Sequence, residues 1–201
     1  MWKSSFEGLE QAVVTEFLIT GGRALMYPVY RGTYERQALE AEKPTGPIGW
    51  RDQNIRWSKE VRRSVDYLET REDIDKQRIG YYGVSWGSNL GPVNVAVEQR
   101  LRLAVLSMGS FLGSGLPPAI DALNFLPRVR VPVLLIGGEQ DIFFPIEESQ
   151  KPFFDLLGTP AEHKQHKVYP GGHGLYGQFT RQIHGDVLGF LDRYFGPVVR
   201  E

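Results

Sequence analysis

Apolar runs of strand length alternate along the chain with longer segments of helical period. The strand-length runs cover residues 24–30, 79–82, 101–108, 131–136 and 166–169. Helical spacing of apolar residues marks the segments 50–70, 86–97, 146–157 and 179–194. Strands that alternate with helices form a parallel sheet covered by helices. We therefore predict an α/β fold with a mostly parallel sheet of about five strands flanked by helices.

The remaining segments have the composition of a helix start and of loops. Ser4 and Glu7 form a capping box, which predicts a first helix that stops at Gly21 and Gly22. Residues 31–49 and 109–118 are rich in glycine, proline or polar residues and are expected to be loops. No stretch resembles a linker between domains, so we expect residues 1–201 to form a single domain.

The pattern Gly83-x-Ser85-x-Gly87 lies between the strand at 79–82 and the helix that follows it. A serine at such a turn adopts a strained backbone conformation that lifts its hydroxyl above the sheet. We expect a side chain in place of either glycine to collide with neighbouring backbone. The following helix directs its N-terminus at the same place, where it would stabilise an oxyanion. Ser85 is therefore the candidate nucleophile, and a tight turn that happens to contain a serine is the alternative.

A serine nucleophile needs a base, and the chain has four histidines. His173 follows the strand at 166–169 and is surrounded by glycines, so its backbone is free to orient the imidazole. His163, His166 and His184 lie in polar or helical segments where surface roles are expected. His173 is the candidate base.

The third member of such a site is an acid that orients the base. Asp141 comes just after the apolar strand at 131–136, and Glu139, two residues earlier, competes with it. The order Ser85, Asp141, His173 is the nucleophile, acid and base order of one hydrolase fold. All three follow predicted strands, at the edge where open parallel sheets place their ligands.

Composition and charge limit the classes of partner and the cellular location that we expect for the protein. The 201 residues include no cysteine, which excludes disulfides, thiolate metal sites and a cysteine nucleophile. A formal net charge of -1 gives no reason to expect nucleic acid or an anionic membrane as a partner. The start of the chain lacks a signal-peptide pattern, and no apolar run approaches the roughly 18 residues that cross a bilayer. We expect a cytoplasmic protein.

The chain resembles the α/β-hydrolase superfamily, in its esterase, dienelactone-hydrolase and prolyl-oligopeptidase-like branch. The segments 24–36, 73–87, 131–145 and 170–174 carry the resemblance. It implies an enzyme that cleaves esters or amides without a metal or organic cofactor. Members of this fold normally begin with strands that precede the helix expected here at Ser4, so the chain looks like a hydrolase that lacks its first strands.

Two expectations follow from that difference. The strand at 24–30 must pair directly with the one at 79–82, or another chain must cover the exposed edge, so we expect a homo-oligomer. One oxyanion donor, the N–H of Trp86, should remain. The second donor must come from residues 2–4 or from the hydroxyl of Tyr30.

We therefore expect a serine carboxylesterase that hydrolyses short-chain esters of small molecules through an acyl-enzyme. The aromatic or apolar residues next to the expected site could line an acyl pocket or belong to the core; they are Trp86, Phe111, Leu112, Phe143 and Phe144. A peptidase of the prolyl-oligopeptidase type, an acyltransferase and a truncated, non-catalytic interaction domain are the alternatives.

Overall fold

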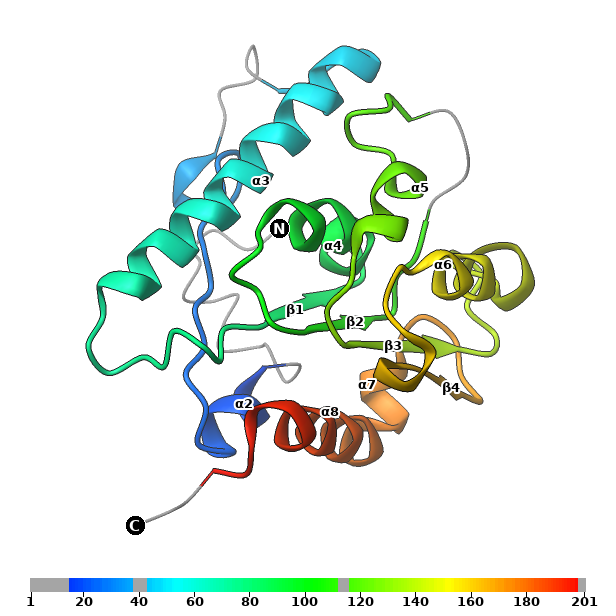
Figure 1. Ribbon diagram of the computed structural model, residues 1–201. Helices are drawn as coiled ribbons and strands as arrows, with labels where there is room; N and C mark the ends of the chain where they lie inside the picture. The colour runs from blue at the N-terminus through cyan, green and yellow to red at the C-terminus, as the bar shows by residue number, and fades with distance from the viewer. Residues whose placement is uncertain (1–14, 38–42, 112–115, 199–201) are drawn as a thin grey trace.

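The structure is a computed structural model, and it describes residues 15–37, 43–111 and 116–198. One parallel sheet of four strands, in the order β1-β2-β3-β4, forms its centre (Figure 1). The strands are β1 (Tyr81–Val84), β2 (Ala104–Ser107), β3 (Val133–Gly138) and β4 (Lys164–Tyr169). Along one line across the sheet, Val84 pairs with Ser107, Ser107 with Ile136 and Ile136 with Lys167.

Helices cover both faces of this sheet and give the molecule three layers (Figure 1). One face carries α3 (Gly46–Thr70), α4 (Trp86–Val97), α5 (Ala122–Phe125) and α6 (Lys151–Leu156). The opposite face carries α2 (Glu16–Thr20), α7 (Leu175–Gln178) and α8 (Thr180–Phe195). Single turns lie at η1 (Tyr34–Arg36), η3 (Leu126–Arg128), η4 (Ile146–Gln150) and η5 (Ala161–His163).

The alternation of side chains along β2 shows how one strand supplies both cores. Ala104 and Leu106 pack with α3 and α4, whereas Leu103 and Val105 pack with α2 and α8. Both sets are almost fully buried. An uninterrupted apolar strand is therefore what this sheet requires, because successive residues point to opposite, covered faces.

The predicted α/β architecture is confirmed, and the four strands lie within or next to the predicted runs. The long helix at α3 and the closing helix at α8 are also confirmed. The expected helix 146–157 is divided into the π-helical turn η4 and the helix α6, which has Pro152 in its first turn. Proline has no N–H to donate to an earlier carbonyl. The helix predicted to open at Ser4 lies mostly outside the described residues, and its described end, α2, stops before Gly21 as expected.

The strand expected at residues 24–30 is wrong: the segment is extended but pairs with no strand in the described residues. Its carbonyl groups bond elsewhere, since Val29 accepts from Arg36 and Tyr30 accepts from the N–H of Thr33. Pro28 has no N–H for a ladder. The sheet accordingly has four described strands, where about five were expected.

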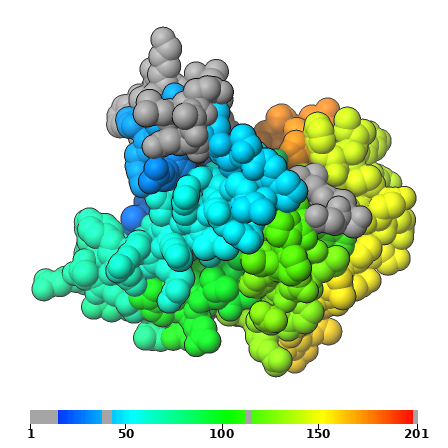
Figure 2. Space-filling model, turned by 90° about the horizontal axis from the view of Figure 1, so that it is seen from above, coloured from blue at the N-terminus to red at the C-terminus, as the bar shows by residue number. Residues whose placement is uncertain are grey.

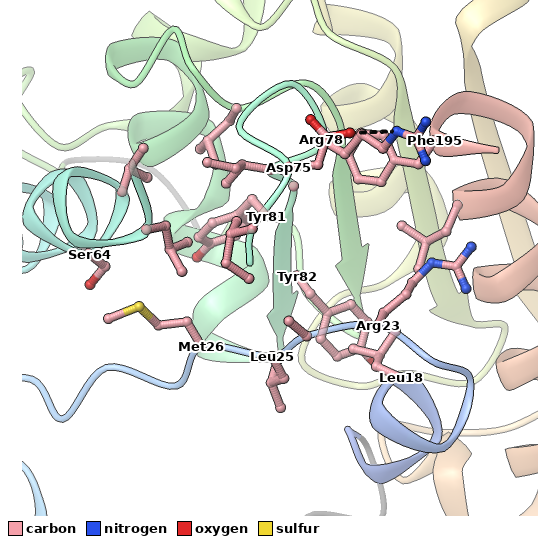
Figure 3. A pocket seen from close by; sticks show the side chains of 18 of the residues that line it. Leu18, Arg23, Leu25, Met26, Ser64, Asp75, Arg78, Tyr81, Tyr82 and Phe195 are labelled. Atoms are coloured by element: carbon pink, nitrogen blue, oxygen red, sulfur yellow. Dashed lines mark ion pairs between the residues drawn. The ribbon is translucent and has the colours of Figure 1, made fainter. Parts of the chain in front are cut away.

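A groove of about 960 Å³ lies along the free edge of β1, in place of the expected strand pairing. Figure 3 shows Leu18 and Leu25 at one end of it and the ion pair between Arg78 and Asp75, 3.0 Å apart, at the other. Apolar side chains of α3 and α8 line its walls. Direct pairing of 24–30 with β1 is not observed, and the homo-oligomer that would cover this edge stays a prediction.

A bilayer-spanning helix would have to be long and apolar, and no helix in the described ranges has that character.

Candidate active site

Ser85 occupies the turn between β1 and α4, with φ 51° and ψ -108°. A residue with a side chain rarely adopts a positive φ, so surrounding contacts must hold it there. At Gly83, a Cβ would lie 2.5 Å from the carbonyl oxygen of Gly87, so only glycine fits. The collision expected at Gly87 is wrong, because a Cβ there would meet only the Tyr81 hydroxyl, at 3.9 Å.

Side-chain hydrogen bonds hold the turn at Ser85 in place. The hydroxyl of Tyr81 donates to the Gly87 carbonyl at 2.6 Å, and burial raises the pKa of Tyr81 to about 12, so the donor is retained at neutral pH. The Ser88 hydroxyl donates to the carbonyl of Gly109 at 2.7 Å, and the Asn89 amide donates to that of Ser110 at 2.6 Å. The start of α4 is thereby tied to the segment that follows β2.

The structure brings Ser85, His173 and Asp141 together in one hydrogen-bonded chain. Ser85 Oγ lies 2.9 Å from His173 Nε2, and His173 Nδ1 lies 2.9 Å from Asp141 Oδ2. The carboxylate can only accept, so Nδ1 carries the proton and Nε2 is left to accept from the serine hydroxyl. This is the arrangement in which an imidazole can take a proton from serine.

Asp141 is fully buried at its side chain and is held by backbone groups of the residues that follow it. Its Oδ1 accepts the N–H groups of Phe143 and Phe144, at 2.9 and 3.1 Å. Glu139, the competing acid, is exposed, and the described hydrogen bonds of His173 go to Ser85 and Asp141 instead. Of the two candidate acids, it is Asp141 that the structure places against His173.

The loops that carry Asp141 and His173 pack directly against each other. The N–H of Gln140 donates to the carbonyl of Gly171 at 2.9 Å, and a Cβ on Gly138 would approach that same oxygen to 2.4 Å. Gln150, which is 2% exposed, donates to the carbonyls of Gly138 and Phe144. Glycine at 138 permits the contact, and the amide of Gln150 satisfies the buried carbonyl groups beside it.

The other three histidines are half-buried, although surface roles were expected for them, and none is the described hydrogen-bond partner of the Ser85 hydroxyl. His166 stacks on Phe154 and bonds to Gln150, and His163 bonds to the Tyr194 hydroxyl. His184 stacks on the ring of Phe17 at 3.9 Å. Their described contacts are with side chains outside the Ser85–His173–Asp141 chain.

The expected oxyanion donors differ in where the structure places them. The N–H of Trp86 belongs to the first residue of α4, directly after Ser85, and no described group accepts from it. Tyr30 lines the groove beside β1, where burial raises its pKa, and has no described contact with Ser85 or His173. Residues 2–4, the other expected source, lie outside the described residues.

The expected pocket residues divide into exposed and buried groups. Phe143 is exposed and its ring meets His173 edge-on, with centroids 5.1 Å apart. Phe144, expected to bind substrate, is 3% exposed and acts on the site through its backbone N–H. Phe111 packs on Phe153 in the core, and Leu112 lies outside the described residues.

Trp50 is a site neighbour that the sequence did not reveal. It lies on α3 and contacts Trp86 with ring centroids 6.3 Å apart. A helical period assigns residues to faces of a helix, but it does not say which other residue a given face meets. Trp57, one heptad further along the same face of α3, packs on Trp50.

Within residues 15–37, 43–111 and 116–198, no three His, Asp or Glu side chains gather into a possible metal site.

Comparisons with known proteins place this geometry in a family. The model of the Dienelactone hydrolase family matches residues 6–181. An uncharacterised protein of Mycobacterium tuberculosis (strain ATCC 25618 / H37Rv) is 30% identical over 129 residues, which cover 57% of this chain and 44% of that protein.

Solved esterase structures share the fold. A cold-adapted esterase from an Arctic intertidal metagenomic library has a TM-score of 0.60 at 21% identity, covering 74% of this chain and 63% of that one. An acetyl xylan esterase from Paenibacillus sp. R4 has a TM-score of 0.65 at 21% identity, covering 82% and 63%. The chain thus spans less than two thirds of the length of these relatives. With a family match over most of its length and the fold of solved esterases, the chain belongs to the Dienelactone hydrolase family, in the α/β-hydrolase superfamily.

Proposed function

We propose that the protein is a serine carboxylesterase that hydrolyses short-chain esters through an acyl-enzyme intermediate. The observation that carries the proposal is the chain of two 2.9 Å hydrogen bonds from Ser85 through His173 to Asp141. It ends at a serine whose backbone strain presents the hydroxyl at the N-terminus of α4. Membership of a hydrolase family supports the same reaction class.

In the first half of the reaction, Ser85 Oγ attacks the ester carbonyl while His173 Nε2 takes its proton. The carbonyl oxygen becomes an oxyanion, which the N–H of Trp86 and the N-terminus of α4 stabilise. His173 then gives its proton to the leaving alcohol as the carbon–oxygen bond breaks. The product is an ester of Ser85.

In the second half, His173 takes a proton from water, and the resulting hydroxide attacks the acyl carbon. This attack forms a tetrahedral intermediate. When it collapses, His173 returns the proton to Ser85 Oγ and the carboxylic acid is released. Throughout the cycle, buried Asp141 keeps the Nδ1 proton in place and stabilises the imidazolium. No step requires a metal or an organic cofactor.

Esters are favoured over peptides because one oxyanion donor is present among the described residues. Loss of one of two donors costs about 100- to 1,000-fold in turnover. Amides have the poorer leaving group and need that stabilisation more. A peptidase of the prolyl-oligopeptidase type would share all three residues, so activity on peptide p-nitroanilides above that on p-nitrophenyl acetate would favour it instead.

The test is hydrolysis of p-nitrophenyl acetate by the wild type and by Ser85→Ala. We expect the variant to lose a factor on the order of 10⁴ to 10⁶ in kcat. Its circular dichroism spectrum and melting temperature should match those of the wild type, because alanine removes only a hydroxyl. Equal turnover by a folded variant would rule out Ser85, and an inactive wild type would favour the non-catalytic alternative.

A further inference from the structure

Large apolar side chains are exposed at residues that neighbour Ser85 or His173. Trp86, the residue after Ser85, is 45% exposed. Ile142 and Phe143, the two residues after Asp141, are 83% and 58% exposed. Exposed apolar residues scattered singly need no explanation, but several gathered beside one reactive serine indicate a binding surface.

A second indole joins Trp86 from a distant part of the chain. Trp50, on the first turns of α3, is 43% exposed and meets Trp86 at an interplanar angle of 62°. Figure 2 looks down on the side of the molecule where the beginning of α3, in cyan, reaches the surface. Two indoles in edge contact form an angled apolar wall next to the nucleophile.

Trp57 supports the Trp50 part of this wall. Trp57 packs on Trp50 at 6.4 Å, and its indole N–H donates to the carbonyl of Arg31 at 2.9 Å. Trp86 contacts Trp50 and directly follows the turn at Ser85. Binding sites are generally preformed, apolar and lined by aromatic side chains in this way.

The direction of proton transfer determines which half of an ester faces the indoles. His173 must reach the leaving oxygen, so the alcohol half lies on the His173 side, where Phe143 meets the imidazole edge-on. The acyl half extends from Ser85 away from His173. Trp86 begins α4 directly after Ser85, and Trp50 is its ring neighbour, so we assign the acyl half to these two indoles.

We propose that Trp50 and Trp86 form an acyl subsite for a flat apolar group, which extends the substrates from short-chain esters to aromatic carboxylic esters and makes Trp50 a specificity-determining residue. Aromatic rings pack well against indoles in stacked or edge-on arrangements, and a flat ring gains more from such a wall than a methyl group does. The proposal rests on the proposed function, because it assigns the acyl side of the site at Ser85.

The test compares kcat/KM for p-nitrophenyl benzoate and p-nitrophenyl acetate, which share a leaving group and differ only in the acyl half. We expect Trp50→Ala to lower the benzoate-to-acetate ratio about tenfold, the factor that about 1.4 kcal/mol represents. Trp50→Phe should restore most of the ratio, whereas Trp50→Leu, apolar but not flat, should not. Tyr67→Ala is the matched control, since Tyr67 is an exposed aromatic residue near the far end of α3.

Two outcomes separate failure of the subsite from failure of the proposed function. A wild type that hydrolyses acetate, with a ratio that Trp50→Ala leaves within twofold, would overturn the subsite alone. A wild type that hydrolyses neither ester would overturn the function, and equilibrium dialysis with 2-naphthoate then decides the subsite. Tighter binding by the wild type than by Trp50→Ala would support it, and equal binding would overturn it.

Discussion

The carboxyl ends of the strands and the free side of β1 are two borders of the same sheet, and they are filled very differently. At the carboxyl ends, Asp141 is buried, both of its oxygens accept hydrogen bonds, and the loops after β3 and β4 touch through their backbones. Along β1, an apolar groove separates the strand from residues 24–30, and no described ladder closes the edge. The proposed active site thus lies at the border where the loops are packed and hydrogen-bonded.

This difference indicates that the candidate site depends on local segments rather than on a complete sheet. Ser85, Asp141 and His173 are each positioned by the turn that follows their own strand. The strands concerned are β1, β3 and β4, which the described chain already pairs through β2. An open edge at β1 therefore leaves the three side chains in hydrogen-bonding reach of one another.

The largest effect should come from a substitution of Asp141, the buried acid at the carboxyl ends of the strands. Asp141→Asn keeps the shape of the side chain but lets an amide N–H face His173, which favours the wrong tautomer. A change of this kind lowers kcat by about 10⁴-fold. Steady-state hydrolysis of p-nitrophenyl acetate measures it.

Glu139→Gln is the control for that change, because it makes the same chemical substitution two residues away on an exposed side chain. Its kcat should stay within about twofold of the wild type. Reversed effects of the two substitutions would mean that the acid is Glu139 and that the loop after β3 is arranged differently in solution.

Two leucine-to-alanine substitutions compare how much each border of the sheet contributes to stability. Leu135→Ala, in the fully buried strand β3, should lower the free energy of unfolding by about 3 to 4 kcal/mol. Leu25→Ala, in the wall of the open groove, should cost about 1 kcal/mol, since less of that side chain leaves water on folding. Urea denaturation measures both values. Equal losses would show that the groove is closed in solution, as a covering second chain would make it.

The smallest expected effect is a pH dependence of stability that arises at His166, in β4. Burial lowers the pKa of His166 below its ordinary value of 6.5, and the charge of Asp155 opposes this only in part. The folded state therefore binds this proton less readily than the unfolded state does. Stability from the neutral imidazole is complete above pH 6.5 and decreases as the pH falls through the lowered value.

Urea midpoints at pH 7.5 and pH 5 test this expectation. The wild type should lose more stability between the two than His166→Gln, whose amide does not titrate. A variant that loses as much as the wild type would assign the pH dependence to other groups.

The sequence predicted those parts of the site that local chemistry determines. Glycines around Ser85 and His173, and an acid after an apolar strand, identified three residues that the structure brings into contact. The alternation of apolar runs predicted the layers and the parallel sheet, because a strand covered on both faces must be apolar throughout.

The features that the sequence did not predict depend on contacts between residues far apart in the chain. Residues 24–30 have the composition of a strand, yet pairing needs a partner edge at the right place, and no single segment specifies that. Gln150 supports the loop of Asp141 from η4, and Trp50 reaches Trp86 from α3. Phe144 shows the converse: its position beside Asp141 suggested a pocket wall, but packing buries its ring.

Labelling with a fluorophosphonate probe tests the central claim most directly, because the probe reacts only with a serine that a base activates. Intact-mass and peptide analysis of the wild type should show one adduct, on Ser85, and none after Ser85→Ala. His173→Ala should abolish labelling, while His163→Ala should leave it unchanged. A folded wild type without label, or label on another serine, would contradict the account.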